Sequence, residues 1–137
     1  MGRWTIKNNR LVYEKAEEIM RTIMEAEFVF KDNRGTLKQL FSSQRGWKQV
    51  NYATSKKDVA RGGHYHKMVT ETFYLIHGRI KVMIKNVKTG REQSKIFETG
   101  DMFQIEPYDK HTLIALEDSE WIAVFDNIIN NSDVHKD

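Results

Sequence analysis

Three histidines and one glutamate, His64, His66, Glu71 and His111, form the most specific chemical pattern in this sequence. His64 and His66 are two residues apart, so on a strand their side chains point to the same face. Glu71 follows after a short connection and can face the same interior from the next strand, and His111 comes from a distant strand. Imidazole and carboxylate groups together suit a first-row divalent metal. We therefore predict that these four residues form a metal site.

The alternation of residues along a strand gives a second reason to expect a cation beside Glu71. Glu71 has the same parity as Phe73 and Leu75, so its carboxylate should point into the core with them. A buried carboxylate is unfavourable without a partner, and a metal held by three imidazoles would be one. A metal-free polar pocket is the alternative interpretation. The ligand set does not choose among zinc, nickel, iron and manganese.

Short strands separated by turn residues must position these groups. Many such strands at regular spacing predict an all-β sandwich or barrel, and one strand, 79–87, shows the alternation of a half-buried sheet. There Ile80, Val82 and Ile84 share one face, and the opposite face carries charged residues. We expect strands at 27–30, 36–41, 47–54, 63–66, 71–76, 79–87, 93–98, 102–106, 111–116 and 121–125.

The N-terminal region has a different periodicity. Apolar residues in 11–27 recur at helical spacing opposite a charged face, which predicts one N-terminal α-helix that covers the body of the fold. We predict one domain over 1–137, made of a helical extension (1–27), a barrel (28–126) and a frayed tail (127–137). His77, before a turn glycine, and His135, in the tail, are interpreted as ordinary structural residues.

The composition of the chain favours some classes of protein and argues against others. The chain has 137 residues, 39% hydrophobic and 30% charged, which is typical of a globular domain. It has no apolar run of membrane-spanning length, no secretory signal and no cysteine, and we expect a cytoplasmic protein with no membrane partner. Its net charge of +3 is dispersed along the chain, which argues against a nucleic-acid partner.

Two motifs resemble those of the cupin superfamily. His64-Tyr65-His66, four residues, Glu71, six residues and Gly78 match the first cupin motif, and Gly100, Pro107 and His111 match the second. The resemblance implies a double-stranded β-helix, which is a jelly-roll barrel, with a divalent metal held by His64, His66, Glu71 and His111.

A narrower resemblance covers about residues 28 to 126. Asp32-x-Arg34-Gly35, Gln49-x-Asn51 and Arg61-Gly62-x-His64-Tyr65 resemble the dTDP-4-dehydrorhamnose 3,5-epimerases, and the chain is also similar to the sugar-nucleotide 3,4-ketoisomerases. The resemblance implies that the barrel holds a nucleotide-linked keto sugar. The implied substrate contacts are Arg34, Arg61, Gln49, Asn51, Lys67 and Gln104. Guanidinium groups suit a diphosphate, although Arg34 fits an exposed turn residue equally well.

Three functions stay open on the sequence alone. The first is an isomerase or epimerase in which a metal polarises the carbonyl of a nucleotide-linked keto sugar or related carbohydrate. The second is a metal-dependent cupin dioxygenase, and the third is a non-catalytic cupin that binds a small molecule. The catalytic residues cannot be assigned from the sequence. A homodimer is implied by the resemblance.

Overall fold

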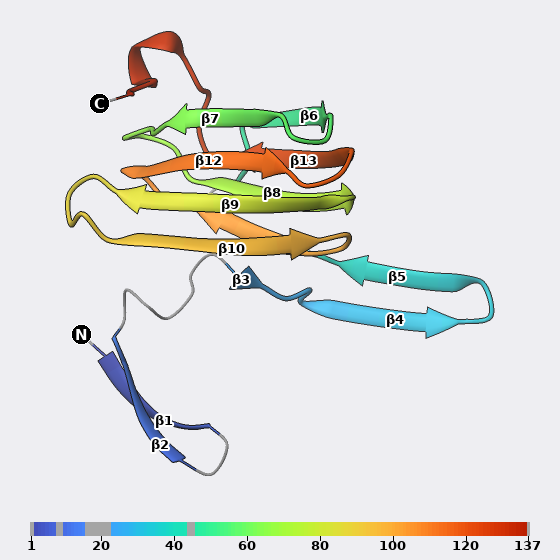
Figure 1. The fold of residues 1–137 in the computed structure, drawn as a ribbon. Coiled ribbons are helices and arrows are strands. Elements are labelled where there is room, and N and C mark those ends of the chain that lie inside the picture. The colour runs from blue at the N-terminus through green and yellow to red at the C-terminus, as the bar shows by residue number, and fades with distance from the viewer. Residues whose placement is uncertain (1, 8–9, 16–22, 44–45, 137) are drawn as a thin grey trace.

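The computed structural model describes residues 2–7, 10–15, 23–43 and 46–136, and the regular secondary structure in them is almost entirely strand (Figure 1). The elements in chain order are β1 (Gly2–Lys7), β2 (Arg10–Lys15), β3 (Ile23–Met24), β4 (Phe28–Asp32), β5 (Gly35–Gln39), β6 (Gln49–Ser55), β7 (Ala60–His64), β8 (Glu71–His77), β9 (Arg79–Asn86), β10 (Glu92–Glu98), β11 (Met102–Ile105), β12 (Asp109–Ala115), β13 (Ser119–Phe125) and the short 3-10 helix η1 (Asn131–Asp133).

Two antiparallel sheets form the body of the fold. One has the strand order β10-β9-β12-β7, and the other has the order β3-β11-β8-β13-β6. Neighbouring strands within each sheet are often far apart in sequence, as is typical of a jelly roll. Apolar side chains from both sheets form one core, in which Leu75, Ile80 and Phe103 are fully buried. The predicted all-β class is confirmed.

The ten strands predicted between residues 27 and 125 are all present, with ends shifted by a few residues. In β9, Ile80, Val82 and Ile84 are buried while Arg79 and Lys85 are exposed. In β8, Glu71 is buried on the same face as Phe73 and Leu75. The alternation of apolar and polar residues in the sequence therefore predicted correctly which face of these strands meets the core.

The predicted N-terminal helix is wrong where the structure describes it. Arg10–Lys15 is strand β2, which pairs with β1 from Gly2↔Lys15 to Lys7↔Arg10, and Ile23–Met24 is strand β3, which pairs with β11. The remainder of the predicted helix, 16–22, lies outside the described residues. Pairing with Gly2–Lys7 gives the backbone of β2 its hydrogen-bond partners, and such non-local pairing overrides a weak helical periodicity.

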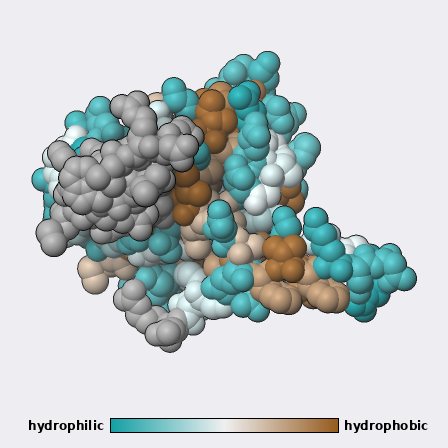
Figure 2. Space-filling model, turned by 90° about the horizontal axis from the view of Figure 1, so that it is seen from below, coloured by the Kyte–Doolittle hydropathy of each residue, from teal (hydrophilic) through white to brown (hydrophobic). Residues whose placement is uncertain are grey.

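The β4–β5 hairpin projects from the sheets (Figure 1), and every residue of its two strands is exposed. Its strands pair from Phe28↔Gln39 to Asp32↔Gly35. Apolar residues gather on this projection, at the right of Figure 2. They include Phe28, Phe30 and Leu37, whose exposed fractions are 53%, 47% and 61%.

The C-terminal segment differs from the predicted frayed tail. Its backbone forms an antiparallel bridge between Tyr65 and His135, and Asp133 is buried. The expectation of fraying was wrong because the segment finds backbone partners beside β7. None of the described residues belongs to a helix that is long and apolar enough to cross a membrane.

Candidate metal and substrate site

The four predicted metal ligands converge at one end of the two sheets. His64 ends β7, His66 follows it, Glu71 begins β8 and His111 lies in β12. Antiparallel pairing of β12 with β7 places His111 opposite His64. The three histidines each offer a ring nitrogen, and these nitrogens all lie within 4.8 Å of one another.

Glu71 completes the cluster from the facing sheet. Its Oε1 lies 2.9 Å from Nε2 of His66, and its Oε2 lies 3.6 Å from Nε2 of His111. The side chains of Glu71, His66 and His111 are each only 4% exposed. The carboxylate is therefore almost out of contact with bulk water, and it faces two imidazole nitrogens.

Backbone carbonyl groups fix the orientation of two of the rings. Nδ1 of His66 lies 2.6 Å from the Asp133 carbonyl oxygen, and Nδ1 of His111 lies 2.9 Å from the Asp109 carbonyl oxygen. A carbonyl oxygen can only accept a hydrogen bond, so both Nδ1 atoms carry the proton. The lone pair of a neutral imidazole is then on Nε2, which in both rings is the atom that faces Glu71.

This arrangement requires a positive charge between the rings and the carboxylate. A neutral Nε2 and a carboxylate oxygen are both hydrogen-bond acceptors, so their 2.9 Å approach is repulsive unless a proton or a metal ion lies between them. Nε2 of His66 is buried and has no hydrogen-bond partner of good geometry among the described residues. Metal-binding histidines commonly donate the other ring N–H to a carbonyl in this way. The donor set therefore fits a divalent metal.

The histidines differ in their affinity for protons. Burial, together with the neighbouring rings of His111 and His66, lowers the pKa of His64. Burial also acts to lower the pKa of His66, but the Glu71 carboxylate and the Asp133 carbonyl outweigh it and raise that pKa above its ordinary value. His66 therefore holds a proton more readily than His64.

A close backbone approach brings β7 against β12 at the cluster. Gly62 has φ +102°, and a Cβ at this position would lie only 2.5 Å from the His111 carbonyl oxygen. The neighbouring Gly63 has φ +73° and open space around it. Gly62 therefore allows the approach that places His64 beside His111.

Two predicted substrate contacts lie on the inner face of β6. Gln49 and Asn51 have the same parity as Ala53, which packs against the core, and the Gln49 side-chain amide donates to the Asn51 side-chain oxygen over 3.1 Å. Phe125 is paired with both Gln49 and Glu71, so Gln49 lies two strands from Glu71 at the same end of the sheet. Both residues are placed to line the space between the sheets.

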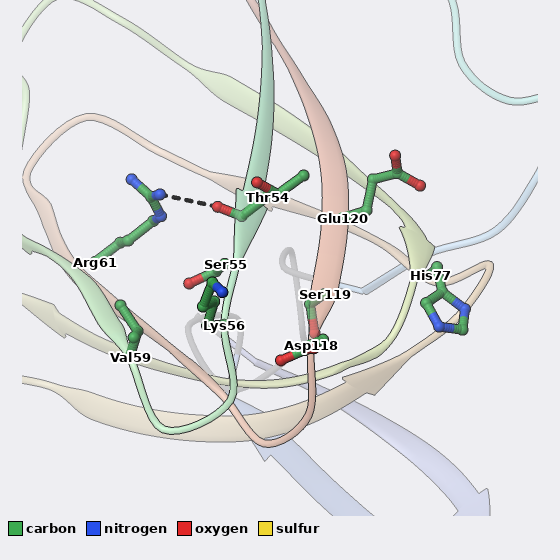
Figure 3. A pocket seen from close by; sticks show the side chains of 9 residues that line it. All are labelled: Thr54, Ser55, Lys56, Val59, Arg61, His77, Asp118, Ser119 and Glu120. Carbon is green, nitrogen blue, oxygen red and sulfur yellow. Dashed lines mark hydrogen bonds between the residues drawn. The ribbon is translucent and has the colours of Figure 1, made fainter.

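Arg61 lies on β7, three residues before His64, and borders a cavity of about 580 Å³. One guanidinium nitrogen donates to the Thr54 carbonyl oxygen over 2.8 Å, and Figure 3 shows Arg61 and Ser55 on the same side of β6. Lys56 lines the same cavity. The hydroxyl of Ser55 is buried and has no hydrogen-bond partner among the described residues. The cavity thus combines two cationic side chains with an unsatisfied hydroxyl and with two acidic side chains, Asp118 and Glu120, and it lies at the end of the strands opposite to Glu71.

Arg34, Gln104 and Lys67 are not brought into the cluster of histidines. Arg34 is at the turn of the projecting hairpin, where its Nε donates to Asp32 over 2.9 Å. Gln104 lies on the outer face of its sheet and donates to Thr72. Lys67 follows His66, but its side chain is exposed. For Gln104 the reason is strand parity, because Phe103 and Ile105 occupy the inward positions of β11.

Sequence reasoning missed Asp133, which contacts His66 and the residues after it. Its carboxylate accepts hydrogen bonds from the backbone N–H groups of Lys67 at 2.8 Å and Met68 at 3.0 Å. Asn130, three residues earlier, caps η1 through its side chain. The sequence from Asn130 to Asp133 is typical of a turn or a helix cap. Nothing in that sequence indicates that the turn docks against His66.

The jelly roll and its cluster of histidines and glutamate define this protein as a cupin, and comparison with solved structures agrees. A dTDP-4-dehydrorhamnose 3,5-epimerase from Sulfolobus tokodaii superposes with a TM-score of 0.67 at 27% identity over 77% of this chain and 70% of the epimerase. A 3,4-ketoisomerase from Helicobacter canadensis gives a TM-score of 0.72 at 18% identity over 84% of this chain and 89% of the other.

The chain belongs to the family described as the polysaccharide biosynthesis C-terminal domain, whose profile matches residues 30–132. A curated relative, the UDP-2-acetamido-2,6-beta-L-arabino-hexul-4-ose reductase of Pseudomonas aeruginosa, is 33% identical over 76 residues, which are 50% of this chain and 20% of the relative. The chain thus spans about a fifth of the length of that relative.

Proposed function

We propose that this protein is a metal-binding cupin that isomerises or epimerises a nucleotide-linked keto sugar. The single observation that carries the metal part is the pair of Nε2 atoms, on His66 and His111, that face a buried carboxylate while their Nδ1 atoms donate to backbone carbonyls. His64, His66, Glu71 and His111 would hold the ion. A bound divalent metal would supply a Lewis acid that polarises a substrate carbonyl.

The proposed substrate class rests on the relatives together with Arg61. The similar epimerase and reductase are both named for nucleotide-linked or keto sugars, and a further solved structure with the same fold, a QdtA ketoisomerase from Thermoanaerobacterium thermosaccharolyticum, is in complex with TDP-4-keto-6-deoxyglucose (TM-score 0.70, 17% identity). Arg61, on the same strand as His64, would take the diphosphate, because a guanidinium matches phosphate oxygens with parallel donors. Gln49 and Asn51 would orient the sugar between the sheets.

Proton exchange tests the reaction. TDP-4-keto-6-deoxyglucose is incubated in heavy water with metal-loaded protein, and NMR follows deuterium at the carbons next to the keto group. We expect deuterium to be incorporated with wild-type protein and incorporation to fall at least about tenfold when Arg61 is changed to Ala, since a diphosphate contact is charge-assisted. If the wild-type protein incorporates no deuterium, the proposed reaction is wrong. Oxygen uptake by iron-loaded protein would instead identify a dioxygenase.

We also propose that the protein pairs with a second copy through the β4–β5 hairpin. The hairpin exposes Phe28, Phe30 and Leu37, and Phe30 and Leu37 are directly paired across it. Clustered exposed apolar residues mark interaction surfaces. Analytical ultracentrifugation should find a dimer that Leu37→Lys dissociates. Ile128→Lys, a change at another exposed apolar residue (63%), should leave the dimer intact.

A further inference from the structure

Residues 130–136, which we call the C-terminal clasp, lie against the strand that carries the histidine pair. The Tyr65 N–H donates to the His135 carbonyl over 2.9 Å, and the His135 N–H donates back to the Tyr65 carbonyl over 3.0 Å. Tyr65 is the residue between His64 and His66. The clasp therefore pairs, through its backbone, with the residue at the centre of the predicted metal motif.

Asp133 gives the clasp its contact with His66. The Asp133 carbonyl oxygen lies 2.6 Å from Nδ1 of His66, and its carboxylate accepts from the N–H groups of Lys67 and Met68. One residue thus holds both the ring of His66 and the two backbone groups that follow it. Since Asp133 is only 9% exposed, these hydrogen bonds are shielded from water.

Further contacts hold the clasp itself in place. The His135 ring stacks on Tyr65 with centroids 5.2 Å apart and planes 30° apart, and its Nε2 lies 3.1 Å from an Asp133 carboxylate oxygen. Lys110 donates through Nζ to the Lys136 carbonyl over 2.8 Å. Lys110 precedes His111, so the clasp bridges the two segments that carry His66 and His111.

His66 and His111 differ in how their Nδ1 atoms are held. His111 donates to Asp109, which lies two residues away in its own strand, so this contact forms with β12. His66 donates to Asp133, which lies 67 residues further along the chain. The orientation of His66 therefore depends on docking of the C-terminal segment, whereas that of His111 does not.

We propose that the C-terminal clasp is a positioning element for His66, with Asp133 as its positioning residue. The clasp holds the Nδ1–H tautomer of His66 and keeps its Nε2 lone pair pointing toward the space between His111 and Glu71. The expected effect of the clasp on metal affinity rests on the proposed metal function. Docking of the clasp and metal binding are then linked, so each stabilises the other.

The test compares Asp133→Ala, Asp133→Asn and the control Asp118→Ala in the full chain. Asp118 makes the same kind of contact, since its carboxylate accepts from the Lys57 N–H over 2.9 Å, but it lies at the opposite end of the strands. Zinc and nickel affinities are measured by competition with a chelator. In histidine-labelled protein, ¹⁵N NMR reports the His66 tautomer and the exchange of its Nδ1 proton with water, with and without zinc.

We expect Asp133→Ala to weaken zinc affinity about 10- to 100-fold, as loss of an outer partner of a ligand usually does. The His66 Nδ1 proton should exchange at least about tenfold faster, because its acceptor is no longer held in place. Asp133→Asn keeps one acceptor oxygen and should restore part of both losses. Asp118→Ala should change neither. If Asp133→Ala does not fold, His135→Ala, which removes the ring stack and the contact to Asp133, should show smaller losses of both kinds.

The outcomes separate this inference from the metal proposal. If wild-type protein binds neither zinc nor nickel, the metal proposal fails, and exchange of the His66 Nδ1 proton in metal-free protein still decides whether the clasp positions the ring. The clasp proposal is overturned if Asp133→Ala, or His135→Ala in its place, leaves that exchange unchanged. It is also overturned if Asp118→Ala weakens metal affinity to the same degree.

Discussion

The substitution Glu71→Gln separates the contribution of metal binding to thermal stability from the contribution of the fold itself. The substitution keeps the size of a side chain that is 4% exposed and removes its charge beside the two Nε2 atoms. Without metal, a proton on His66 offsets the charge of the buried Glu71 carboxylate. Removing one charge of a buried pair is destabilising when the other stays unpaired, but in this variant His66 can lose its proton and accept a hydrogen bond from the introduced amide through Nε2. The metal-free variant should therefore melt at the wild-type temperature or slightly above it.

The metal-loaded proteins should behave in the opposite way. A ligand at one hundred times its Kd stabilises the native state by about 2.7 kcal/mol. For a chain of this size, that corresponds to a rise in Tm of about 10 °C. Loss of a ligand that weakens binding by about 100-fold leaves about 0.4 kcal/mol at the same metal concentration, or roughly 2 °C. Most of the metal-induced shift should disappear in Glu71→Gln.

Differential scanning calorimetry with and without zinc measures both effects. Glu98→Gln is the matched control, because Glu98 is 68% exposed and pairs with Arg79 at the surface. This control should keep the full metal-induced shift. A Glu71→Gln protein that retains the wild-type shift would show that Glu71 does not hold the metal, and the charge argument for the site would then be refuted.

Three further predictions follow from the same geometry. His66→Ala should lower the bound metal per chain and the Tm together, as measured by elemental analysis and calorimetry; a variant that loses neither would make His66 a packing residue. Because the pKa of His66 is raised, zinc must displace its proton, so zinc affinity measured by titration should fall about tenfold per pH unit below that pKa. His64, whose pKa is lowered, should add no second proton near neutral pH, and an affinity independent of pH would contradict this account. Gly62→Ala should lower the free energy of unfolding in urea by about 3 kcal/mol and weaken metal binding, because its Cβ would meet the His111 carbonyl. The control Gly63→Ala should lower the free energy of unfolding by about 1 kcal/mol, through backbone strain alone. Equal losses in the two variants would refute the close approach of β7 to β12.

The sequence predicted the barrel well because strand alternation is a local signal. Ile80, Val82 and Ile84 recur at every second position, and only a strand places all three against one core. The same parity predicted that Glu71 is buried with Phe73 and Leu75. The N-terminal prediction failed because β2 depends on pairing with Gly2–Lys7, and a residue window of helical length contains no information about such a partner.

Substrate contacts were predicted less well than metal ligands. Arg61, Gln49 and Asn51 lie on strands whose inner faces border the space between the sheets. Gln104 is only one residue from Ile105, and in β11 that single step moves its side chain to the outer face. Arg34 lies in a hairpin whose direction relative to the sheets has no signature in the sequence.

The sequence alone determined the chemistry available to this protein, because residue types and strand spacing fix three imidazoles and a carboxylate on inward-facing positions. Only the tertiary structure decided how those groups are oriented. The proton on Nδ1 of His66 is held by Asp133 from the far end of the chain, and β12 approaches β7 closely only because Gly62 lacks a side chain. Both features arise from contacts between segments that are distant in sequence, where neither alternation nor spacing carries information.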